Sequence, residues 1–83
     1  MFFVYVLRCK DGSFYTGYTN DVEKRVATHN NGTASKYTRS RLPVKLVYHK
    51  QYSTKSEAMR AEAAFKRLTR NEKVRHLSSS KKT

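Results

Sequence analysis

The sequence predicts a small α+β (α/β) domain: a three-stranded sheet with flanking helices in the order β-β-α-β-α-α. Three short runs are rich in the β-branched and aromatic residues that favour strands. Two other stretches show helical spacing behind a capping pattern. With 83 residues, the chain can bury one small hydrophobic core. We therefore expect a single domain over residues 1–77 and a disordered basic tail over 78–83.

The first two strands are expected to form a hairpin. Residues 2–9 read FFVYVLRC without clean alternation, which indicates a strand buried on both faces. Asp11-Gly12 is a strong turn signal, and FYTGYT at 14–19 forms the returning strand. Gly17 weakens that strand, so it indicates a bulge or the close approach of another group.

The first helix is expected over about residues 21–30. Asn20 and Glu23 have the spacing of a capping box at its start, and Gly32 follows its end. A polar, basic loop then continues to Pro43.

The third strand and two further helices complete the expected order. Residues 44–52 form the strand, which is again rich in β-branched and aromatic residues. Thr54 and Glu57 form a second capping-box pattern, which opens a helix through about Leu68. Asn71 is expected to cap a short last helix that ends near Leu77.

Charge is the strongest compositional signal. Lys and Arg number 18 against six Asp and Glu, which gives a formal net charge of +12. Repulsion of this size destabilises a small domain, so a nucleic-acid partner is the simplest explanation. A basic surface that only confers solubility is the alternative. The expected phosphate-contacting residues are Lys24, Lys36, Arg39, Arg41 and Lys45.

Several other classes of protein do not fit the sequence. Cys9 is the only cysteine, so it has no partner for an internal disulfide, and no His/Cys cluster has zinc-ligand spacing. The apolar run at 2–7 is too short for a signal peptide or a membrane span. We expect a cytoplasmic protein that does not contact membranes, as a monomer or weak dimer.

A carboxylate lies among the apolar positions of the helix expected after Thr54. At about 100° per residue, Ala58 and Phe65 share one apolar stripe and Met59 marks its other edge. Glu62 falls inside that arc. A carboxylate near a core is costly unless a cation or hydrogen-bond donors compensate it, so Glu62 is a candidate metal ligand. The alternatives are a structural salt bridge to a nearby arginine, or a helix rotated so that Glu62 is exposed.

Two further groups resemble the parts of a hydrolytic site. Arg25 and His29, four residues apart, are stacked along the inward edge of the first helix. Their alternative roles are an arginine that extends past the core and a partly buried histidine. Tyr5 and Tyr15 lie on the two hairpin strands, where core packing is the default role of each. Together, phenols, a guanidinium, an imidazole and a carboxylate are groups that phosphate hydrolysis would use.

The hairpin register decides whether both tyrosines can reach one site. A two-residue turn at Asp11-Gly12 would pair Arg8 with Tyr15 and place Tyr5 on the opposite face. A shared site therefore requires a loop with an odd number of residues, or a bulge that shifts the register.

At these residues the chain resembles the GIY-YIG endonuclease family, and most of all its short bacterial members that consist of little but this domain. The likeness covers residues 2–77. The motif residues, in chain order, are Phe3-Val4-Tyr5, Tyr15-Thr16-Gly17, Arg25, His29 and Glu62. Phe3 and Thr16 replace a glycine and an isoleucine of the family's motifs, whereas the motif tyrosines and Gly17 are retained.

The resemblance implies a metal-dependent endonuclease that cleaves phosphodiester bonds in DNA, with structure-specific substrates in repair or recombination. Glu62 would hold one Mg²⁺ or Mn²⁺, and Arg25 would bind a phosphate oxygen. Tyr5 or Tyr15 would deprotonate the attacking water with the help of His29, and the choice between the phenols stays open. The alternatives are a non-catalytic nucleic-acid-binding module, or an adaptor with a protein partner in a repair complex.

Overall fold

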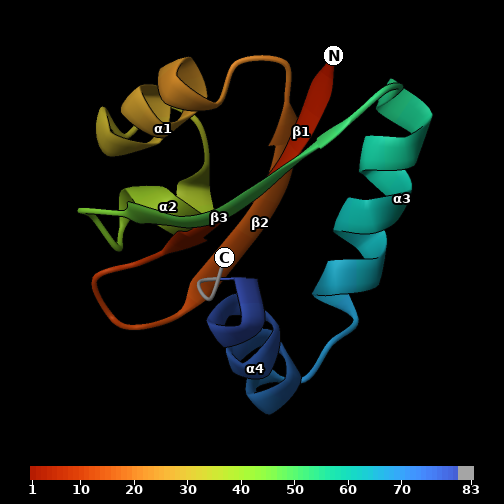
Figure 1. Cartoon of the computed structure of the whole chain (residues 1–83). Coiled ribbons are helices and arrows are strands. Elements are labelled where there is room, and N and C mark those ends of the chain that lie inside the picture. Colours follow the sequence, from red (N-terminus) through yellow and green to blue (C-terminus); the bar gives the residue numbers. More distant parts are fainter. Residues whose placement is uncertain (81–83) are drawn as a thin grey trace.

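A three-stranded antiparallel sheet forms the centre of the structure, a computed structural model that describes residues 1–80. The strands are β1 (Phe2–Arg8), β2 (Phe14–Thr19) and β3 (Lys45–Tyr52), in the spatial order β2-β1-β3. The first strand of the hairpin is therefore the central one, and β2 and β3 are both edge strands (Figure 1). The predicted α+β architecture is confirmed.

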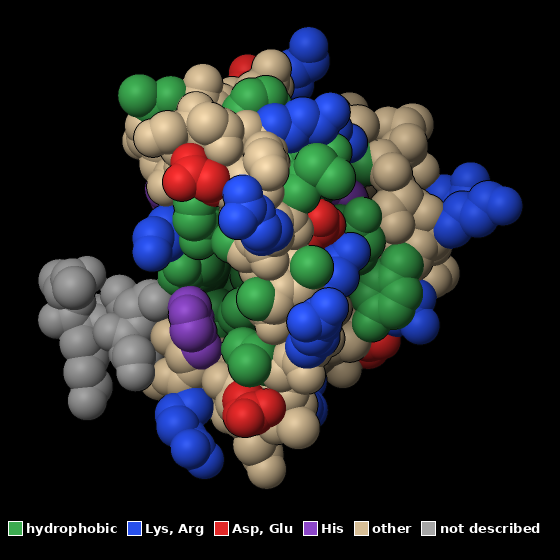
Figure 2. All heavy atoms as spheres, turned by 90° about the vertical axis from the view of Figure 1, so that its right-hand side faces the viewer, with side chains coloured by type: hydrophobic (Ala, Val, Ile, Leu, Met, Phe, Trp, Pro, Cys, Tyr) green, Lys and Arg blue, Asp and Glu red, His purple; other side chains and the backbone are tan. Residues whose placement is uncertain are grey.

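Helices cover both faces of this sheet. α1 (Val22–Asn30) and α2 (Lys36–Arg39) lie on one side, and α3 (Lys55–Lys66) and α4 (Arg70–Ser80) lie on the other (Figure 1). Lysine and arginine side chains surround the face that α3 presents, with only a few acidic side chains among them (Figure 2). In residues 1–80 no helix has the length and apolar character needed to cross a membrane.

The central strand β1 supplies the core on both faces. Val4, Tyr5, Val6 and Leu7 are all buried, as the unbroken apolar run predicts. Tyr5 and Leu7 pack toward α1 and α2, in a cluster that also contains Val26 and Val44. Val6 packs in the other direction, against Phe65 and Leu77 of α3 and α4. Alternation along one strand therefore divides the core into two halves.

The hairpin register places both motif tyrosines on one face. Arg8 pairs with Phe14 rather than Tyr15, so residues 9–13 form an odd-numbered loop. A hydrogen bond from Cys9 N to Ser13 O, 2.8 Å long, closes that loop. Tyr5 then lies opposite Gly17, and Tyr15 lies two residues along on the same face. The condition for a shared tyrosine site is therefore met.

The start of α1 differs from the prediction. Asp21, not Asn20, is the N-cap, and its side chain accepts a hydrogen bond from Lys24 N at 3.1 Å. Asp21 has the extended backbone that a cap residue requires and lies directly before the first helical residue. The predicted start of the helix is therefore correct within one residue, and Asn20 does not cap the helix. The capping box of Thr54 and Glu57 is confirmed at the start of α3.

The segment expected to be an irregular loop contains a helix. α2 has four residues and begins after Ser35, whose side chain accepts a hydrogen bond from Tyr37 N. A single helical turn is too short to show an apolar period, so the sequence pattern did not indicate it.

The last helix was also predicted with the wrong cap. Thr69 and Glu72 form a reciprocal pair of hydrogen bonds at its start, so Asn71 lies inside the helix rather than before it. α4 continues to Ser80, and residues 78–80 are therefore helical instead of belonging to a disordered tail. The remainder of the expected tail, residues 81–83, lies outside the described residues.

Candidate active site

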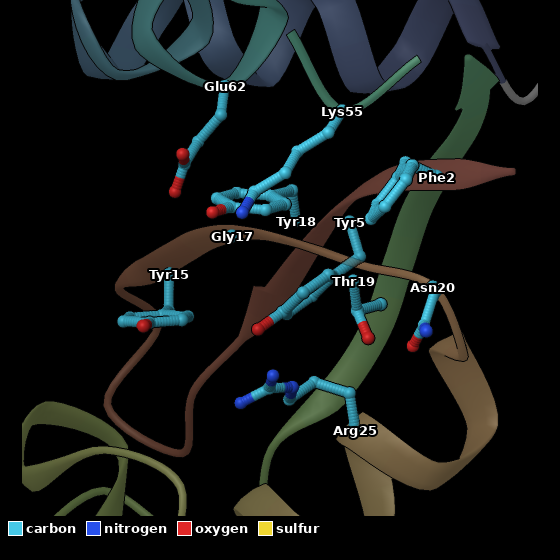
Figure 3. Close-up of a pocket in the computed structure, with 10 residues that line it drawn as sticks. All are labelled: Phe2, Tyr5, Tyr15, Gly17, Tyr18, Thr19, Asn20, Arg25, Lys55 and Glu62. Carbon is cyan, nitrogen blue, oxygen red and sulfur yellow. The ribbon is translucent and has the colours of Figure 1, made fainter. Parts of the chain in front are cut away.

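A hollow of about 400 Å³ opens along the edge strand β2 (Figure 3). The predicted catalytic residues Tyr5, Tyr15, Arg25 and Glu62 all line it. The remaining predicted catalytic residue, His29, lies behind Tyr5, where it is 1% exposed. The structure therefore brings together the whole predicted set, with His29 in a supporting position.

The hollow reaches around β2 from one face of the sheet to the other. Tyr15 lies on the α1 side, whereas Tyr18, which pairs with Val4, lies on the α3 side. Arg25 extends into the hollow from α1 and Glu62 from α3, on opposite sides of the β2 ribbon (Figure 3). This meeting is possible because β2 is an edge strand, with no further strand to separate the two faces.

Gly17 is the point in β2 where Tyr5 passes closest. A Cβ atom at position 17 would lie 2.5 Å from the Tyr5 hydroxyl oxygen and 2.7 Å from Cζ of the same ring. Any larger residue would collide with the phenol. The predicted close approach at Gly17 is therefore confirmed, and the approaching group is the motif tyrosine of β1.

A buried hydrogen-bond chain holds Tyr5. The Tyr5 hydroxyl lies 2.9 Å from His29 Nε2, and His29 Nδ1 lies 2.9 Å from Thr38 Oγ1. Thr38 donates its own proton to the Ser35 carbonyl at 3.3 Å, so Thr38 Oγ1 accepts from His29 Nδ1–H. His29 Nε2 is then an acceptor, and the Tyr5 hydroxyl donates to it.

Burial and nearby charges keep the Tyr5 phenol and the His29 imidazole neutral. Burial raises the pKa of Tyr5 well above its usual range; Tyr15 and Glu62 raise it further, whereas Arg25 opposes this change. Burial also lowers the pKa of His29, and the positive charge of Arg25 lowers it further. A neutral imidazole is the form that can accept the Tyr5 proton, which agrees with the hydrogen-bond directions.

Aromatic rings extend from the site toward the surface. Tyr15 makes an edge contact with His29 at 5.0 Å between centroids, and it stacks on Tyr37 of α2 at 6.0 Å. The Arg41 guanidinium lies over the Tyr37 ring at 4.0 Å. α2 therefore has two functions in the fold: Thr38 orients His29, and Tyr37 supports Tyr15.

Glu62 is half of an ion pair at the other side of the hollow. Its carboxylate lies 3.1 Å from Lys66 Nζ, one helical turn further along α3. The salt-bridge alternative is therefore realised, with a lysine of the same helix instead of a nearby arginine. The Glu62 side chain is 18% exposed and that of Lys66 is 55% exposed, so water competes with this pair.

The donor set fits a hydrated hard cation. Among residues 1–80, no group of three or more His, Cys, Asp and Glu side chains could enclose a metal. Mg²⁺ and Mn²⁺ keep several waters and need only one or two protein carboxylates, so Glu62 in an open hollow suffices for them. A soft metal that needs several thiolate or imidazole ligands does not fit these residues.

The predicted phosphate-contacting residues occupy two regions. Lys24 lies beside Arg25 on α1, and Lys36 and Arg39 belong to α2, on the same side of the sheet. Lys45 is exposed at the start of β3, away from the hollow. Arg41 is engaged within the protein, because it pairs with Asp11 at 3.0 Å and donates to the Tyr37 carbonyl at 2.8 Å.

Some residues of the site were not identified from the sequence. Tyr18, Asn20 and Lys55 line the hollow, and Thr38 is fully buried behind it. Asn20 was interpreted as a helix cap, and Lys55 is one of many basic residues. The alternation of strand β2 could have indicated Tyr18 as a residue of the opposite face. No sequence signal singles out Thr38, because its role depends on a partner nine residues away.

Comparisons with known proteins identify relatives over nearly the whole chain. Residues 1–75 match the family model described as the GIY-YIG catalytic domain. The chain is 54% identical to the UPF0213 protein SAG0778 of Streptococcus agalactiae, over 95% of this chain and 90% of that protein. A UPF0213 protein of Bacillus licheniformis is 55% identical, over 96% of this chain and 82% of the relative.

Solved structures show the same fold. The solution structure of the UPF0213 protein BH0048 from Bacillus halodurans aligns with a TM-score of 0.62 at 48% identity, and covers 94% of this chain and 84% of that chain. The protein EF2693 from E. faecalis aligns with a TM-score of 0.62 at 49% identity, and covers 93% of this chain and 82% of that chain.

Proposed function

The chain belongs to the GIY-YIG catalytic domain family, and from that premise we propose that it is a metal-dependent endonuclease that hydrolyses phosphodiester bonds in DNA. The observation that carries the proposal is the hollow at β2, which a carboxylate, a guanidinium and a hydrogen-bonded phenol line together. A basic surface around such a site would hold a phosphate backbone.

Arg25 is proposed to bind the scissile phosphate. Its side chain enters the hollow from α1, opposite Glu62 (Figure 3). A guanidinium presents two parallel donors to phosphate oxygens, and its charge stabilises the negative charge that develops during attack. Lys24, the next residue toward the N-terminus, would contact a neighbouring phosphate.

Tyr5 is proposed to take the proton from the attacking water. A raised pKa means that Tyr5 is a neutral phenol, so it can accept a proton only if it releases its own. His29 Nε2 lies 2.9 Å from the hydroxyl and is placed to receive that proton. One proton thus moves from water to Tyr5 as another moves from Tyr5 to His29, and hydroxide attacks phosphorus. Solvent then protonates the leaving oxygen, and the proton held by His29 returns through Tyr5 to solvent.

Tyr15 has a different proposed role. Its ring stacks on Tyr37 and makes an edge contact with His29, and its hydroxyl forms no hydrogen bond to another described residue. It therefore lacks the proton acceptor that Tyr5 has, and it is proposed to form the wall of the hollow and contact the substrate. This difference supports Tyr5 as the base.

Glu62 is proposed to hold the metal ion. When bound there, Mg²⁺ or Mn²⁺ would supply a Lewis acid that stabilises charge on the phosphate and the leaving oxygen. The exposed side chain of Lys66 can turn away from Glu62 into solvent and leave the carboxylate available.

The test is cleavage of labelled linear, flapped and branched DNA with Mg²⁺. Glu62→Gln and Arg25→Ala are each expected to reduce cleavage at least about 100-fold, as is typical when a group that stabilises the transition state is removed. Glu57→Gln is the matched control, because it is the same change on the same helix and keeps the capping box. It is expected to leave cleavage unchanged.

The basic surface by itself supports a second candidate, a binding module without catalysis. Binding is expected to weaken with salt, with a log–log slope of about −3 to −4 if about four phosphates are neutralised. If the protein binds DNA but breaks no strand of the linear, flapped or branched DNA with Mg²⁺, the binding module is favoured. Breaks that persist in Glu62→Gln would exclude the proposed metal ligand.

A further inference from the structure

A second hollow lies on the other side of α3 from Glu62. Its volume is about 260 Å³, and it is enclosed by β3, α3 and α4. Figure 2 shows an apolar hollow with a histidine at its edge beside α3. None of the residues that line this hollow also lines the candidate active site. Nothing in the proposed hydrolysis uses it.

Aromatic side chains form half of its lining, and aliphatic side chains form the rest. The rings of Tyr48 and Phe65 are nearly parallel, with centroids 6.4 Å apart and an interplanar angle of 8°. His76 meets both rings with its edge, at 5.1 Å from Tyr48 and 5.5 Å from Phe65. Tyr52 also lines the hollow. Flat, rigid rings of this kind favour a flat ligand that can stack on them.

Positive charge is interleaved with these rings. Tyr48, Lys50 and Tyr52 alternate along β3 and face the α3 side, because they pair with Val6, Val4 and Phe2 of β1. Lys50 Nζ lies 5.6 Å from the centre of the Tyr52 ring. Lys73 Nζ on α4 lies 5.9 Å from that of Phe65. Among the described residues, no Asp or Glu lines the hollow.

We propose that this hollow, the aromatic hollow, binds an unpaired nucleobase of single-stranded DNA. A base would stack on the Tyr52 ring, which is only partly buried, and Lys50 and Lys73 would contact the phosphates on either side of it. Aromatic rings alternating with cations are the general means by which proteins hold single strands. A second copy of the chain is a poor occupant, because two chains of net charge +12 repel each other.

The position of the aromatic hollow also refines the proposed substrate. α3 carries Glu62 toward one hollow and Phe65 toward the other. A DNA segment cleaved at Glu62 would therefore have an unpaired region beside Phe65, along the other flank of the same helix. This inference rests on the proposed function, and it favours DNA with an unpaired segment close to the cleaved bond.

The test measures binding of labelled single-stranded and duplex oligonucleotides by fluorescence anisotropy in EDTA, where no metal-dependent cleavage occurs. Tyr52→Ala is expected to weaken single-strand binding about tenfold, in the range measured for loss of one stacking ring, and to change duplex binding less than about twofold. Tyr52→Phe keeps the ring and should bind as the wild type does. Met59→Ala, on the exposed surface of α3 and outside both hollows, is the control.

Circular dichroism confirms that each variant is folded before binding is compared. An equal loss for single strand and duplex in Tyr52→Ala, or a loss in Tyr52→Phe as large as in Tyr52→Ala, would overturn the proposal. Self-association of the wild type that Tyr52→Ala abolishes would instead identify a second copy as the occupant and overturn it too.

The two proposals fail in different ways. Glu62→Gln should lose cleavage and keep the single-strand preference, because Glu62 is not part of the aromatic hollow. If the protein cleaves DNA but binds single strands no more tightly than duplexes, only the aromatic-hollow proposal is excluded. A single-strand preference that depends on Tyr52, with no cleavage of any DNA, would remove only the nuclease.

Discussion

The two sides of the candidate active site are built in opposite ways. On the α1 side, Tyr5, His29 and Thr38 are almost completely buried and joined by hydrogen bonds of 2.9 Å. On the α3 side, Glu62 is partly exposed and paired with the exposed Lys66 of its own helix. We call the α1 side the fixed side, because the core holds its side chains in place. We call the α3 side the adjustable side, because its exposed ion pair can open into solvent.

This difference suits the two proposed tasks. Proton transfer needs donor and acceptor atoms held at hydrogen-bond distance, which a buried chain provides. A hydrated cation needs a carboxylate that can change its partners, and an exposed ion pair permits that exchange. We therefore expect substitutions on the fixed side to change stability and activity together, and substitutions on the adjustable side to change activity or ion binding alone.

Gly17→Ala is expected to give the largest effect on the fixed side. The new Cβ would collide with the Tyr5 ring, and overpacking of this kind destabilises proteins by about 1–3 kcal/mol. Displacement of the phenol should reduce cleavage about 100-fold, since shifts near 1 Å have that consequence in catalytic sites. Cleavage rates and thermal unfolding measure the two effects. In a Tyr5→Phe background the second substitution should add little to the loss of cleavage; full additivity would contradict a role through Tyr5.

Thr38→Val comes next, because it leaves the shape of the side chain almost unchanged and removes the partner of His29 Nδ1. A buried imidazole N–H without an acceptor should lower the free energy of unfolding by about 1–3 kcal/mol. Thr38→Ser keeps the hydroxyl and is the matched control. Urea unfolding measures both variants, and equal stability of valine and serine variants would show that the hydrogen bond does not matter.

Acidification should weaken the fixed side by a smaller amount. The pKa of His29 in the folded protein lies below its ordinary value of 6.5, so the unfolded chain takes up this proton first as pH falls. The contribution of His29 to stability is complete above about pH 6.5 and decreases below it, toward the folded pKa. NMR titration of the His29 ring should give a pKa under 6.5. A value above 6.5 would mean that the imidazole is charged and donates to Tyr5.

Lys66→Ala should have the smallest effect on stability. An exposed pair within one helix contributes less than about 1 kcal/mol, so unfolding should change little. The freed carboxylate is expected to bind Mn²⁺ more tightly, which paramagnetic broadening of amide signals near Glu62 would detect. A large loss of stability would show that the α3 side is fixed as well, and the contrast between the two sides would disappear.

Much of the fold could be predicted because its signals are local. The apolar run of β1, the returning strand with Gly17 and the capping box at Thr54 each depend on neighbouring residues, and each is confirmed. The wrong helix caps were predicted where several local solutions compete. Asn20 and Asp21 are both acceptable caps, and only the backbone angles select between them.

Part of the candidate site could be predicted because some of its residues are unusual for their local sequence pattern. Glu62 stood out in this way, and Gly17 stood out as a glycine within a strand; both line the hollow. Thr38 and Tyr37 did not stand out, because hydroxyl and aromatic residues are ordinary in a polar segment. Their importance comes from contacts with His29 and Tyr15, which lie far from them in the chain.

By itself the sequence determined the strand and helix types, the excess of positive charge and the candidate residues of the site, since composition and spacing act over a few residues. Only the tertiary structure decided that Tyr5 and Tyr15 share a face, that His29 is buried against the Tyr5 hydroxyl instead of facing solvent, and that Glu62 and Arg25 meet across β2. The physical reason is that register, burial and the partner of a hydrogen bond depend on segments that meet only after the chain has folded.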